Sequence, residues 1–465
     1  MVLVESFSGI RGIYGSELTE VITEKYAQAY MNLLNKKYPD KTSFKIVIGR
    51  DSRKSSEELL KIFINNINCE IINIGLMPTP VIENAVRVFN AHGGIIITAS
   101  HNEPNFNGFK FLDKDGAILR PKDIDFVINQ VKLIKDIPQA NRNAKITNKE
   151  KEALEKYENL LEDILKINKI NSGVKIVVDP NGGSGIVLKK IFDKFNINAH
   201  YINMNIGEFK RLIEPKEESL KYLEKYIKEQ NADFAVGFDC DADRVEILLN
   251  NGELVSGNHI LALIAEEIFS EDNNSNTKKS IVVNDATSYI IKEITEKYNS
   301  EFKEVEVGEI NVVDEMLVLN SPIGGEGSNG GVIIPPSRCR DGILTVLLLL
   351  KIISKRKKSL KELIDELPKY YYIKEKINLK EDFVKLKDKV RQYYLNKNFQ
   401  ILETGDETGG LKAIKNNSWV WFRQSKTEDK ILRIIADSKN ENTAKELLIE
   451  AKILLIKQEQ LQDIK

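Results

Sequence analysis

The stretch GGIIITASHNEPNFNGFK, residues 93–110, joins an uninterrupted apolar run to a polar loop directly behind it. Similar apolar runs occur at 45–49 (KIVIG) and 70–75 (EIINIG), and the neighbouring segments 20–37 and 55–67 carry helical patterns. Alternation of apolar strands with helices is typical of a parallel sheet with crossover helices. The sequence therefore predicts an α/β fold for this part of the chain.

The same pattern recurs further along. KIVVDPNGGSG at 175–185 predicts a strand, a glycine-rich turn and a helix, and DFAVGFD at 233–239 predicts a buried strand that runs into an acidic loop. The turn sequence Asn250-Asn251-Gly252 is typical of a hairpin. SIVVND at 280–285 predicts a strand of a third α/β unit. We interpret the glycine-rich turn as structural, because it has no P-loop lysine and no dinucleotide-binding spacing.

A chain of 465 residues exceeds the size of a single hydrophobic core, so several domains are expected. The polar segment Gln139 to Lys149 is a plausible linker, and after Pro368 the pattern changes to short mixed segments that end in an amphipathic helix at 441–457. We predict three similar α/β domains with mixed sheets and a smaller C-terminal α+β domain. The predicted bounds are 1–140, 150–250, 251–367 and 368–465.

The composition excludes several classes of protein. Hydrophobic residues make up 42% and charged residues 29%, with a net charge of −1, which is typical of a globular protein and gives no basic surface for nucleic acid. The apolar segment Ile343 to Leu350 is too short to cross a membrane and predicts a buried helix. Cys69, Cys240 and Cys339 are odd in number and widely spaced, and no secretory signal precedes them, so we expect a cytoplasmic protein.

The polar loop behind the strand at 93–99 offers a candidate nucleophile. Ser100 would lie at the carboxyl end of that strand, where open α/β sheets bind ligands, with His101 and Lys110 close in sequence. An alternative is a polar strand-to-helix turn in which Ser100 and Asn102 only cap a helix. The segment alone leaves both interpretations open.

The segment GFDCDADR predicts a metal site. Asp239, Asp241 and Asp243 alternate behind a predicted strand, and three carboxylates at this spacing can converge on Mg²⁺ or Ca²⁺. An EF-hand is excluded, because its loop would need glycine at Arg244 and glutamate at Asn250. A solvated acidic turn is the weaker alternative, since three clustered carboxylates without a cation repel one another.

Two further loops carry candidate ligand-binding groups. The glycine-dense loop GGEGSNGG contains Glu326, Ser328 and Asn329, which can approach a polar ligand closely. Such loops are common, so this signal is weak on its own.

The segment FRQSKTEDKILRI places cationic and hydroxyl donors between two apolar strands. These residues are Arg423, Ser425, Lys426 and Thr427, and they suit an anion such as phosphate. The alternative is a solvated charged hairpin. Arg11 in SGIRG and Arg53 in GRDSR are additional guanidinium groups, and for Arg53 we favour a surface ion pair.

Taken in this order, SGIRG, TASHN with NGFK, DCDADR, the GE-containing glycine loop and R-x-S-x-T-E resemble the α-D-phosphohexomutase family. The landmarks span nearly the whole chain. The resemblance implies three α/β domains and a fourth, phosphate-binding domain around a central cleft. It also implies an enzyme that interconverts the 1- and 6-phosphates of mannose, glucose or glucosamine through a phosphoserine, with Mg²⁺ and a hexose 1,6-bisphosphate intermediate that also serves as activator.

The resemblance assigns roles to the candidate residues. Ser100 would be the phosphorylated serine, and a phosphate oxygen on it would share Mg²⁺ with the three aspartates. Arg11 and Arg244 would neutralise the transferred phosphoryl group, and Lys110 and His101 are candidates for general acid or base. The sugar would bind at Glu326, Ser328 and Asn329, and the phosphate that does not react would bind at Arg423, Ser425, Lys426 and Thr427.

Two loops depart from the family pattern. Glu103 stands where the family usually has a proline after the serine and histidine, and Lys426 and Asp429 replace a small residue and a proline in the last loop. These departures support an alternative hypothesis, a non-catalytic sugar-phosphate-binding relative. A third hypothesis is a phosphoserine-using hydrolase, which would release free phosphate. The sequence specifies neither the preferred hexose nor the oligomeric state.

Overall fold

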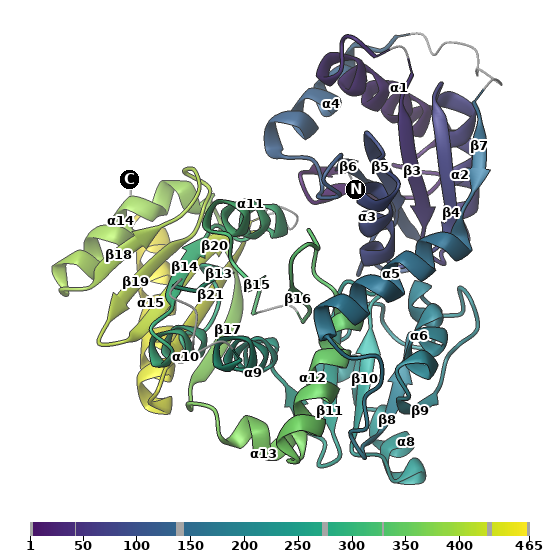
Figure 1. Ribbon diagram of the computed structural model, residues 1–465. Coiled ribbons are helices and arrows are strands. Elements are labelled where there is room, and N and C mark those ends of the chain that lie inside the picture. Colours follow the sequence, from purple (N-terminus) through teal and green to yellow (C-terminus); the bar gives the residue numbers. More distant parts are fainter. Residues whose placement is uncertain are drawn as a thin grey trace. The chain divides into compact units, whose positions relative to one another are not determined.

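The computed structural model describes residues 3–41, 43–135, 144–271, 278–327, 330–425 and 430–462 (Figure 1). The chain divides into two compact units. The first unit contains Met1–Ser256 and Asn329–Leu360, and the second contains Gly257–Ser328 and Lys361–Lys465. Within the described ranges, no helix is both long enough and apolar enough to span a bilayer.

The first sheet has seven strands in the order β1-β2-β6-β5-β3-β4-β7. The predicted apolar runs form β3, β4 and β5, which pair in parallel, whereas β6 runs antiparallel to β5. The sheet is therefore mixed. Its strands are β1 (Val4–Ser6), β2 (Gly9–Ile13), β3 (Lys45–Arg50), β4 (Glu70–Leu76), β5 (Gly93–Ile97), β6 (Phe106–Asp113) and β7 (Ile146–Asn148).

Helices cover both faces of this sheet (Figure 1). On one face, α1, α2 and α4 pack over the alternate strand residues Ile46, Ile95 and Phe109 in one buried cluster. The opposite strand residues face α3, where Ile82 and Val86 lie close to the sheet glycines. Because successive strand residues point to opposite faces, continuous apolar strands can serve both layers. The helices are α1 (Glu20–Lys37), α2 (Ser56–Asn66), α3 (Thr79–Val88) and α4 (Pro121–Leu133).

The predicted linker from Gln139 to Lys149 differs from the structure in part. Its first residues, up to 143, lie outside the described residues, but Ile146–Asn148 forms β7, which pairs in parallel with β4. An edge strand of three residues is specified by main-chain pairing rather than by apolar periodicity, and Ile146 remains 47% exposed. This is why the sequence pattern gave no strand signal.

The second sheet, in the order β12-β11-β10-β8-β9, is also mixed. β10 pairs in parallel with β8 and antiparallel with β11. The predicted Asn-Asn-Gly turn joins β11 to β12, with Gly252 at φ +85°. The elements are β8 (Lys175–Asp179), β9 (Asn198–Tyr201), β10 (Phe234–Phe238), β11 (Val245–Leu249), β12 (Leu254–Val255), α5 (Glu150–Leu165), η1 (Ser184–Val187), α6 (Leu188–Lys194), α7 (Glu217–Leu220) and α8 (Leu223–Gln230).

The segment 330–360 of the first unit contains β16 (Val332–Ile333) and α12 (Gly342–Arg356). Helix α12 packs on α5 and β11, and its residues from Ile343 to Leu350 are all buried, as the apolar run predicted. Asp341 caps the helix by accepting the N–H of Leu344 at 2.9 Å, and it also accepts the hydroxyl of Tyr157.

In the second unit, β14 (Glu301–Val305), β13 (Ser280–Asn284) and β15 (Ile323–Gly325) pair in parallel in that order. The associated helices are α9 (Gly257–Ser270), α10 (Ile290–Lys297) and α11 (Glu309–Leu319). These strands and helices form the third α/β domain of the chain.

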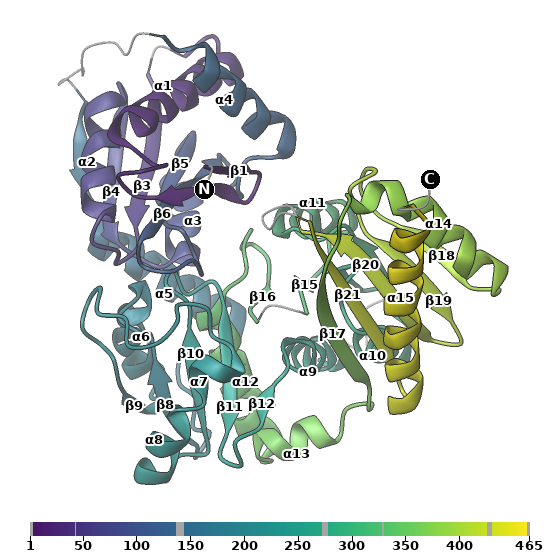
Figure 2. The ribbon, with the colours of Figure 1, turned by 180° about the vertical axis from the view of Figure 1, so that it is seen from behind.

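The C-terminal sheet is entirely antiparallel, in the order β17-β21-β20-β19-β18. Helices α14 and α15 cover one face and share a buried core with it (Figure 2). On the other face of the sheet, Trp419 and Trp421 pack against Ala286 and Tyr289 of the third α/β domain. The elements are α13 (Leu360–Asp365), β17 (Tyr371–Asn378), α14 (Phe383–Asn396), β18 (Gln400–Glu403), β19 (Leu411–Lys415), β20 (Ser418–Gln424), β21 (Ile431–Ser438) and α15 (Glu441–Gln462).

Candidate active site

The serine loop, residues 98–105, connects β5 to β6. The alternative of a strand-to-helix turn is therefore wrong, because the chain enters a strand after the loop and Ser100 caps no helix. Ser100 is 1% exposed and has a left-handed backbone at φ +50°, and its N–H donates to Thr98 Oγ1 at 2.8 Å. For a residue with a Cβ this conformation costs about 1–2 kcal/mol, so the surrounding structure must hold it.

The metal loop, residues 239–244, connects β10 to β11. One carboxylate oxygen from each of Asp239, Asp241 and Asp243 lies within 4.8 Å of the others. All three side chains are buried, with exposed fractions of 1%, 0% and 1%. The alternative of a solvated acidic turn is therefore wrong.

Cations surround this acidic cluster. Lys110 Nζ, on β6, lies 3.0 Å from Asp241 Oδ2 and 3.4 Å from Asp243 Oδ2. Arg340 Nη2 lies 3.5 Å from Asp243 Oδ2, and the hydroxyl of Thr79 donates to Asp241 Oδ2 at 2.7 Å. The glycine in the NGFK motif is explained by close packing, since a Cβ on Gly108 would lie 2.1 Å from the carbonyl oxygen of Ile10.

The environment shifts the pKa values of Asp239 and Asp243 in opposite directions. Burial and the charges of Asp243 and Asp241 raise the pKa of Asp239 well above its ordinary value. Burial alone would also raise the pKa of Asp243, but the cations Lys110, Arg340 and Arg244 outweigh it and lower this pKa. The cluster is thus held together by positive charge.

Part of the cluster lacks hydrogen-bond donors. Within the part of the chain that the structure describes, Asp241 Oδ1 and Asp243 Oδ1 are buried and accept no hydrogen bond. Buried carboxylate oxygens are costly without a partner. Hard oxygen ligands aimed at a common point fit a divalent cation such as Mg²⁺.

Ser100 faces this cluster. Its hydroxyl donates to Asp239 Oδ2 at 3.3 Å and lies 3.5 Å from His101 Nδ1. The charge of Arg244, followed by burial, lowers the pKa of His101 well below its ordinary value, which keeps the imidazole neutral. The structure thus brings together the serine, the histidine and the aspartates that the sequence singled out.

Arg11 and Arg244 lie at the same site. Arg11 Nη1 donates to Asn102 Oδ1 at 3.1 Å, and burial together with the charge of Arg244 lowers the pKa of Arg11 to about 10. The backbone N–H of Arg244 donates to Asp239 Oδ1 at 3.3 Å, and its guanidinium lies 3.6 Å from Glu214. Two guanidinium groups near Ser100 provide positive charge for an anionic ligand.

The prediction of a surface ion pair for Arg53 is wrong. Arg53 is 1% exposed and donates to main-chain carbonyls of the serine loop. Arg340 and Thr79, which contact the aspartates, were also not singled out from the sequence. Arg340 had a weak signal, a charged residue directly before the helix cap Asp341, whereas the approach of Thr79 depends on the packing of α3 against the metal loop.

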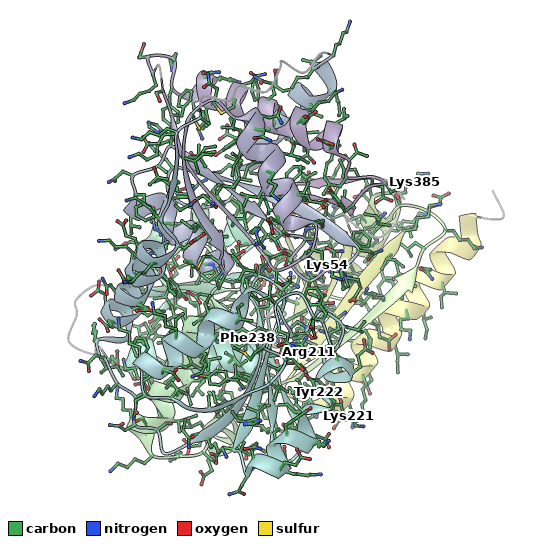
Figure 3. The ribbon with its side chains drawn as sticks, turned by 90° about the vertical axis from the view of Figure 1, so that its right-hand side faces the viewer. Lys54, Arg211, Lys221, Tyr222, Phe238 and Lys385 are labelled. Atoms are coloured by element: carbon green, nitrogen blue, oxygen red, sulfur yellow. The ribbon has the colours of Figure 1, made fainter. Side chains whose placement is uncertain are left out.

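A buried network supports the metal loop from the second sheet. Arg211 Nη2 donates to the carbonyl oxygen of Phe238 at 2.7 Å, and Arg211 Nε pairs with Asp179 at 2.6 Å (Figure 3). The hydroxyl of Tyr222 also donates to Asp179 at 2.6 Å. Asp179, in the segment 175–185, therefore bonds to two side chains of the same sheet region.

In the second unit, Glu326 lies behind β15 and is 5% exposed. Its Oε1 accepts hydrogen bonds from Asn284 Nδ2 at 2.9 Å and from the N–H of Gly308 at 3.0 Å. The carboxylate is thus held at the carboxyl ends of the parallel strands, the edge at which open α/β sheets bind ligands.

Arg423, near the end of β20, donates from Nη2 to Glu306 Oε1 at 2.9 Å. Its Nε is buried and has no hydrogen-bond partner among the described residues. The N–H of Ser425 donates to the carbonyl of Ile431 at 2.7 Å and closes the end of the β20–β21 pair. The predicted ligands Ser328, Asn329, Lys426 and Thr427 lie outside the described residues.

Solved structures share this arrangement of sheets. A phosphoglucomutase/phosphomannomutase family protein from Burkholderia thailandensis has a TM-score of 0.83 at 21% identity over 98% of each chain. An Aspergillus fumigatus N-acetylphosphoglucosamine mutase, solved with GlcNAc-6P and magnesium, has a TM-score of 0.65 at 14% identity over 98% of this chain and 95% of that one. The fold is therefore that of the sugar-phosphate mutases, and the predicted fold class is confirmed.

Sequence relationships define the family. Family models for domains I, II and III of phosphoglucomutase/phosphomannomutase match residues 5–137, 155–252 and 256–371. A phosphoglucomutase/phosphomannomutase of Thermococcus kodakarensis is 33% identical over 95% of each chain. A phosphoglucosamine mutase of Methanocaldococcus jannaschii is 32% identical over 97% of this chain and 98% of its own. The chain belongs to the phosphoglucomutase/phosphomannomutase family, the α-D-phosphohexomutases, as the motifs predicted.

Proposed function

We propose that this chain interconverts hexose 1-phosphate and hexose 6-phosphate, with Ser100 carrying the phosphoryl group. The observation that supports this most directly is the 3.3 Å contact between Ser100 Oγ and Asp239 Oδ2 inside a buried cluster of acids and cations. The related mutases are named for glucose, mannose and glucosamine phosphates, so we propose these three sugars as the substrate class.

The proposed reaction has two transfers. The P–O bond at phosphorylated Ser100 breaks and a new P–O bond forms at the free hydroxyl of the hexose monophosphate; the proton of this hydroxyl passes to a base, and Ser100 Oγ takes up a proton as it leaves. The resulting 1,6-bisphosphate then returns its other phosphoryl group to Ser100 Oγ, which gives up its proton to a base, and the sugar oxygen that leaves takes up a proton. Lys110 and His101 are the proposed proton carriers, because their nitrogens lie at the cluster and beside Ser100 Oγ.

We propose that Asp239, Asp241 and Asp243 hold Mg²⁺ together with an oxygen of phosphorylated Ser100. The two carboxylate oxygens that accept no hydrogen bond among the described residues support this assignment. When bound, Mg²⁺ neutralises charge on the transferred phosphoryl group. Arg11 and Arg244 add guanidinium charge at the same place.

The remaining ligand contacts are proposed in the glycine-dense loop and in the loop that follows β20. Glu326, Ser328 and Asn329 would bind sugar hydroxyls, and the phosphate that does not react would bind at Arg423, Ser425, Lys426 and Thr427. The buried Arg423 Nε, which lacks a partner among the described residues, supports an anion at that position. The buried free thiols of the three cysteines suit a reducing cytoplasm, which we propose as the location.

The test is a coupled assay with glucose, mannose and glucosamine 1-phosphates, in Mg²⁺ and the matching bisphosphate, on wild type and Ser100→Ala. We expect turnover on at least one sugar, and a loss of at least about a thousandfold in the variant. Absence of turnover on all three sugars would contradict the proposal. Stoichiometric binding without turnover would instead support a non-catalytic relative, and steady release of free phosphate would support a hydrolase.

A further inference from the structure

Arg53 follows β3 and is buried beneath the serine loop. Its guanidinium donates to four main-chain carbonyl oxygens, three of them in the serine loop and the fourth on Phe106, the first residue of β6. The acceptors and distances are Ser100 at 2.8 Å, Asn102 at 2.6 Å, Glu103 at 2.7 Å and Phe106 at 3.2 Å. With the Nε–H donated to Asp51 Oδ2 at 3.0 Å, every one of the five N–H groups that arginine possesses has an acceptor.

Between Ala99 and Asn105 the serine loop forms neither strand nor helix, and the main-chain bonds within it are turn bonds, such as that from the N–H of Asn102 to the carbonyl of Ala99 at 3.1 Å. The carbonyl groups that Arg53 binds face a buried side chain, where an unpaired carbonyl would be unfavourable. One of these carbonyls belongs to Ser100, whose left-handed backbone at φ +50° directs the hydroxyl toward Asp239. Arg53 therefore holds the residue that presents the nucleophile, without touching the hydroxyl itself.

Arg53 is itself held in place. Asp51 and Arg53 both have fully buried side chains, and Asp51 Oδ1 accepts the N–H of Arg53 at 3.0 Å and the hydroxyl of Ser56 at 2.6 Å. Asp51 Oδ2 also accepts Cys240 Sγ at 3.3 Å, and Cys240 lies between two aspartates of the metal loop. Asp51 thus links Arg53, which binds the serine loop, to Cys240 of the metal loop.

We propose that Arg53 is a positioning residue for phosphoryl transfer, which fixes the backbone of Ser100 so that its oxygen stays in line with the aspartate cluster. This proposal rests on the proposed function, in which Ser100 carries the phosphoryl group. A planar guanidinium can serve carbonyls on two sides at once, whereas the ammonium of lysine has a single nitrogen. Arg53→Lys therefore preserves the charge and removes most of the contacts.

The experiment measures kcat and KM of the full-length enzyme in Mg²⁺ with glucose 1,6-bisphosphate, normalised to the fraction of protein that accepts phosphate on Ser100 by intact mass. For Arg53→Lys we expect kcat to fall by at least about thirtyfold, because small displacements of a reacting group are costly. We expect KM for the sugar phosphate to change by less than about threefold, since all five N–H groups of Arg53 are donated to Asp51 and to main-chain carbonyls around Ser100. The ³¹P resonance of phosphorylated Ser100 should also shift or broaden.

Arg120→Lys is the matched control. Arg120 lies in the same domain and forms a two-point pair with Asp115, at 3.0 and 2.7 Å, away from the serine loop. We expect wild-type kcat and an unchanged ³¹P resonance for this variant. If Arg53→Lys does not fold, Asp51→Asn serves instead, because it keeps Arg53 and weakens its anchor, together with the contacts of Asp51 to Ser56 and Cys240; we then expect a smaller fall in kcat with KM unchanged.

A purely structural role for Arg53 predicts a lower melting temperature but wild-type kcat per phosphorylated molecule, and that result would overturn the inference. If wild type accepts no phosphate on Ser100, the proposed function fails and the inference fails with it. If wild type turns over and Arg53→Lys has the same normalised kcat and ³¹P resonance, the inference alone fails.

Discussion

The candidate residues of the two units differ in what they contact. In the first unit they contact one another, since Ser100 reaches Asp239 and Lys110 reaches Asp241 and Asp243. Among the described candidates of the second unit, Glu326 bonds to Asn284 and Arg423 bonds to Glu306. The proposed reacting groups are therefore already in contact with one another, whereas Glu326 and Arg423 are held by other protein groups. Changes in the first unit should affect kcat, and changes in the second should affect KM.

After Ser100→Ala, the largest expected effect is that of Asp241→Asn. The substitution removes one charge from the proposed Mg²⁺ site and leaves Lys110 less well compensated, so we expect kcat/KM to fall by at least about a hundredfold. Steady-state assays over a range of Mg²⁺ concentrations measure this. Asp193→Asn is the control, because Asp193 forms only an exposed pair with Lys189. If Asp241→Asn keeps wild-type activity and Mg²⁺ dependence, the proposed Mg²⁺ site at the metal loop is wrong.

The second prediction compares stability rather than activity. Asp341 in the first unit and Asp437 in the second each have a pKa raised by burial to about 6. Asp437 accepts hydrogen bonds from Ser288 and from the N–H of Tyr289, and Lys412 is the nearby cation that opposes the rise. Because the folded state binds the proton more tightly than the unfolded state, this contribution to stability is full below about pH 4 and is lost as pH rises through about 6.

Asp437→Asn cannot lose a proton in this range. We therefore expect the free energy of unfolding of wild type, relative to the variant, to fall by about 2 kcal/mol between pH 4 and pH 7. Denaturant unfolding at both pH values measures it, and the contribution of Asp341 cancels in the difference. An equal difference between the two proteins at both pH values would contradict the prediction.

The third prediction concerns Arg423, a proposed phosphate ligand in the second unit. Arg423→Lys keeps the charge but loses the planar donor geometry, so we expect KM for the sugar phosphate to rise by about tenfold with a smaller change in kcat. Arg433 is its register partner on β21 and is exposed, so Arg433→Lys is the matched control. A large fall in kcat with unchanged KM would indicate that Arg423 acts on the reacting groups. It would contradict the expectation that changes in the second unit affect KM.

The smallest effect is expected for Thr404→Val. The hydroxyl of Thr404 donates to buried Asp285 Oδ2 at 2.5 Å, beside the indole N–H of Trp421 at 2.9 Å. Loss of one donor to a buried carboxylate should lower the free energy of unfolding by about 1 kcal/mol, measured by denaturant titration. Thr408→Val removes a similar hydroxyl bond to Asp406 in an exposed loop and should have almost no effect.

Local pattern alone determined much of this protein. The apolar runs at 45–49 and 70–75 became strands, and the run at 93–99 did so as far as Ile97, because continuous hydrophobic segments bounded by turns are stable only when buried in a sheet. The serine loop and the metal loop were found for a related reason, since polar residues directly behind buried strands must lie at the carboxyl edge of the sheet.

Only the tertiary structure decided which of these residues meet and which are buried. Arg53 resembles a surface arginine in GRDSR, yet it lies beneath the serine loop and bonds to main-chain carbonyls that every sequence possesses. Arg340 and Thr79 reach the aspartates from remote positions in the chain. Such contacts depend on the packing of α3, β6 and the segment before α12 around the metal loop. The type of residue at a single position does not predict that packing.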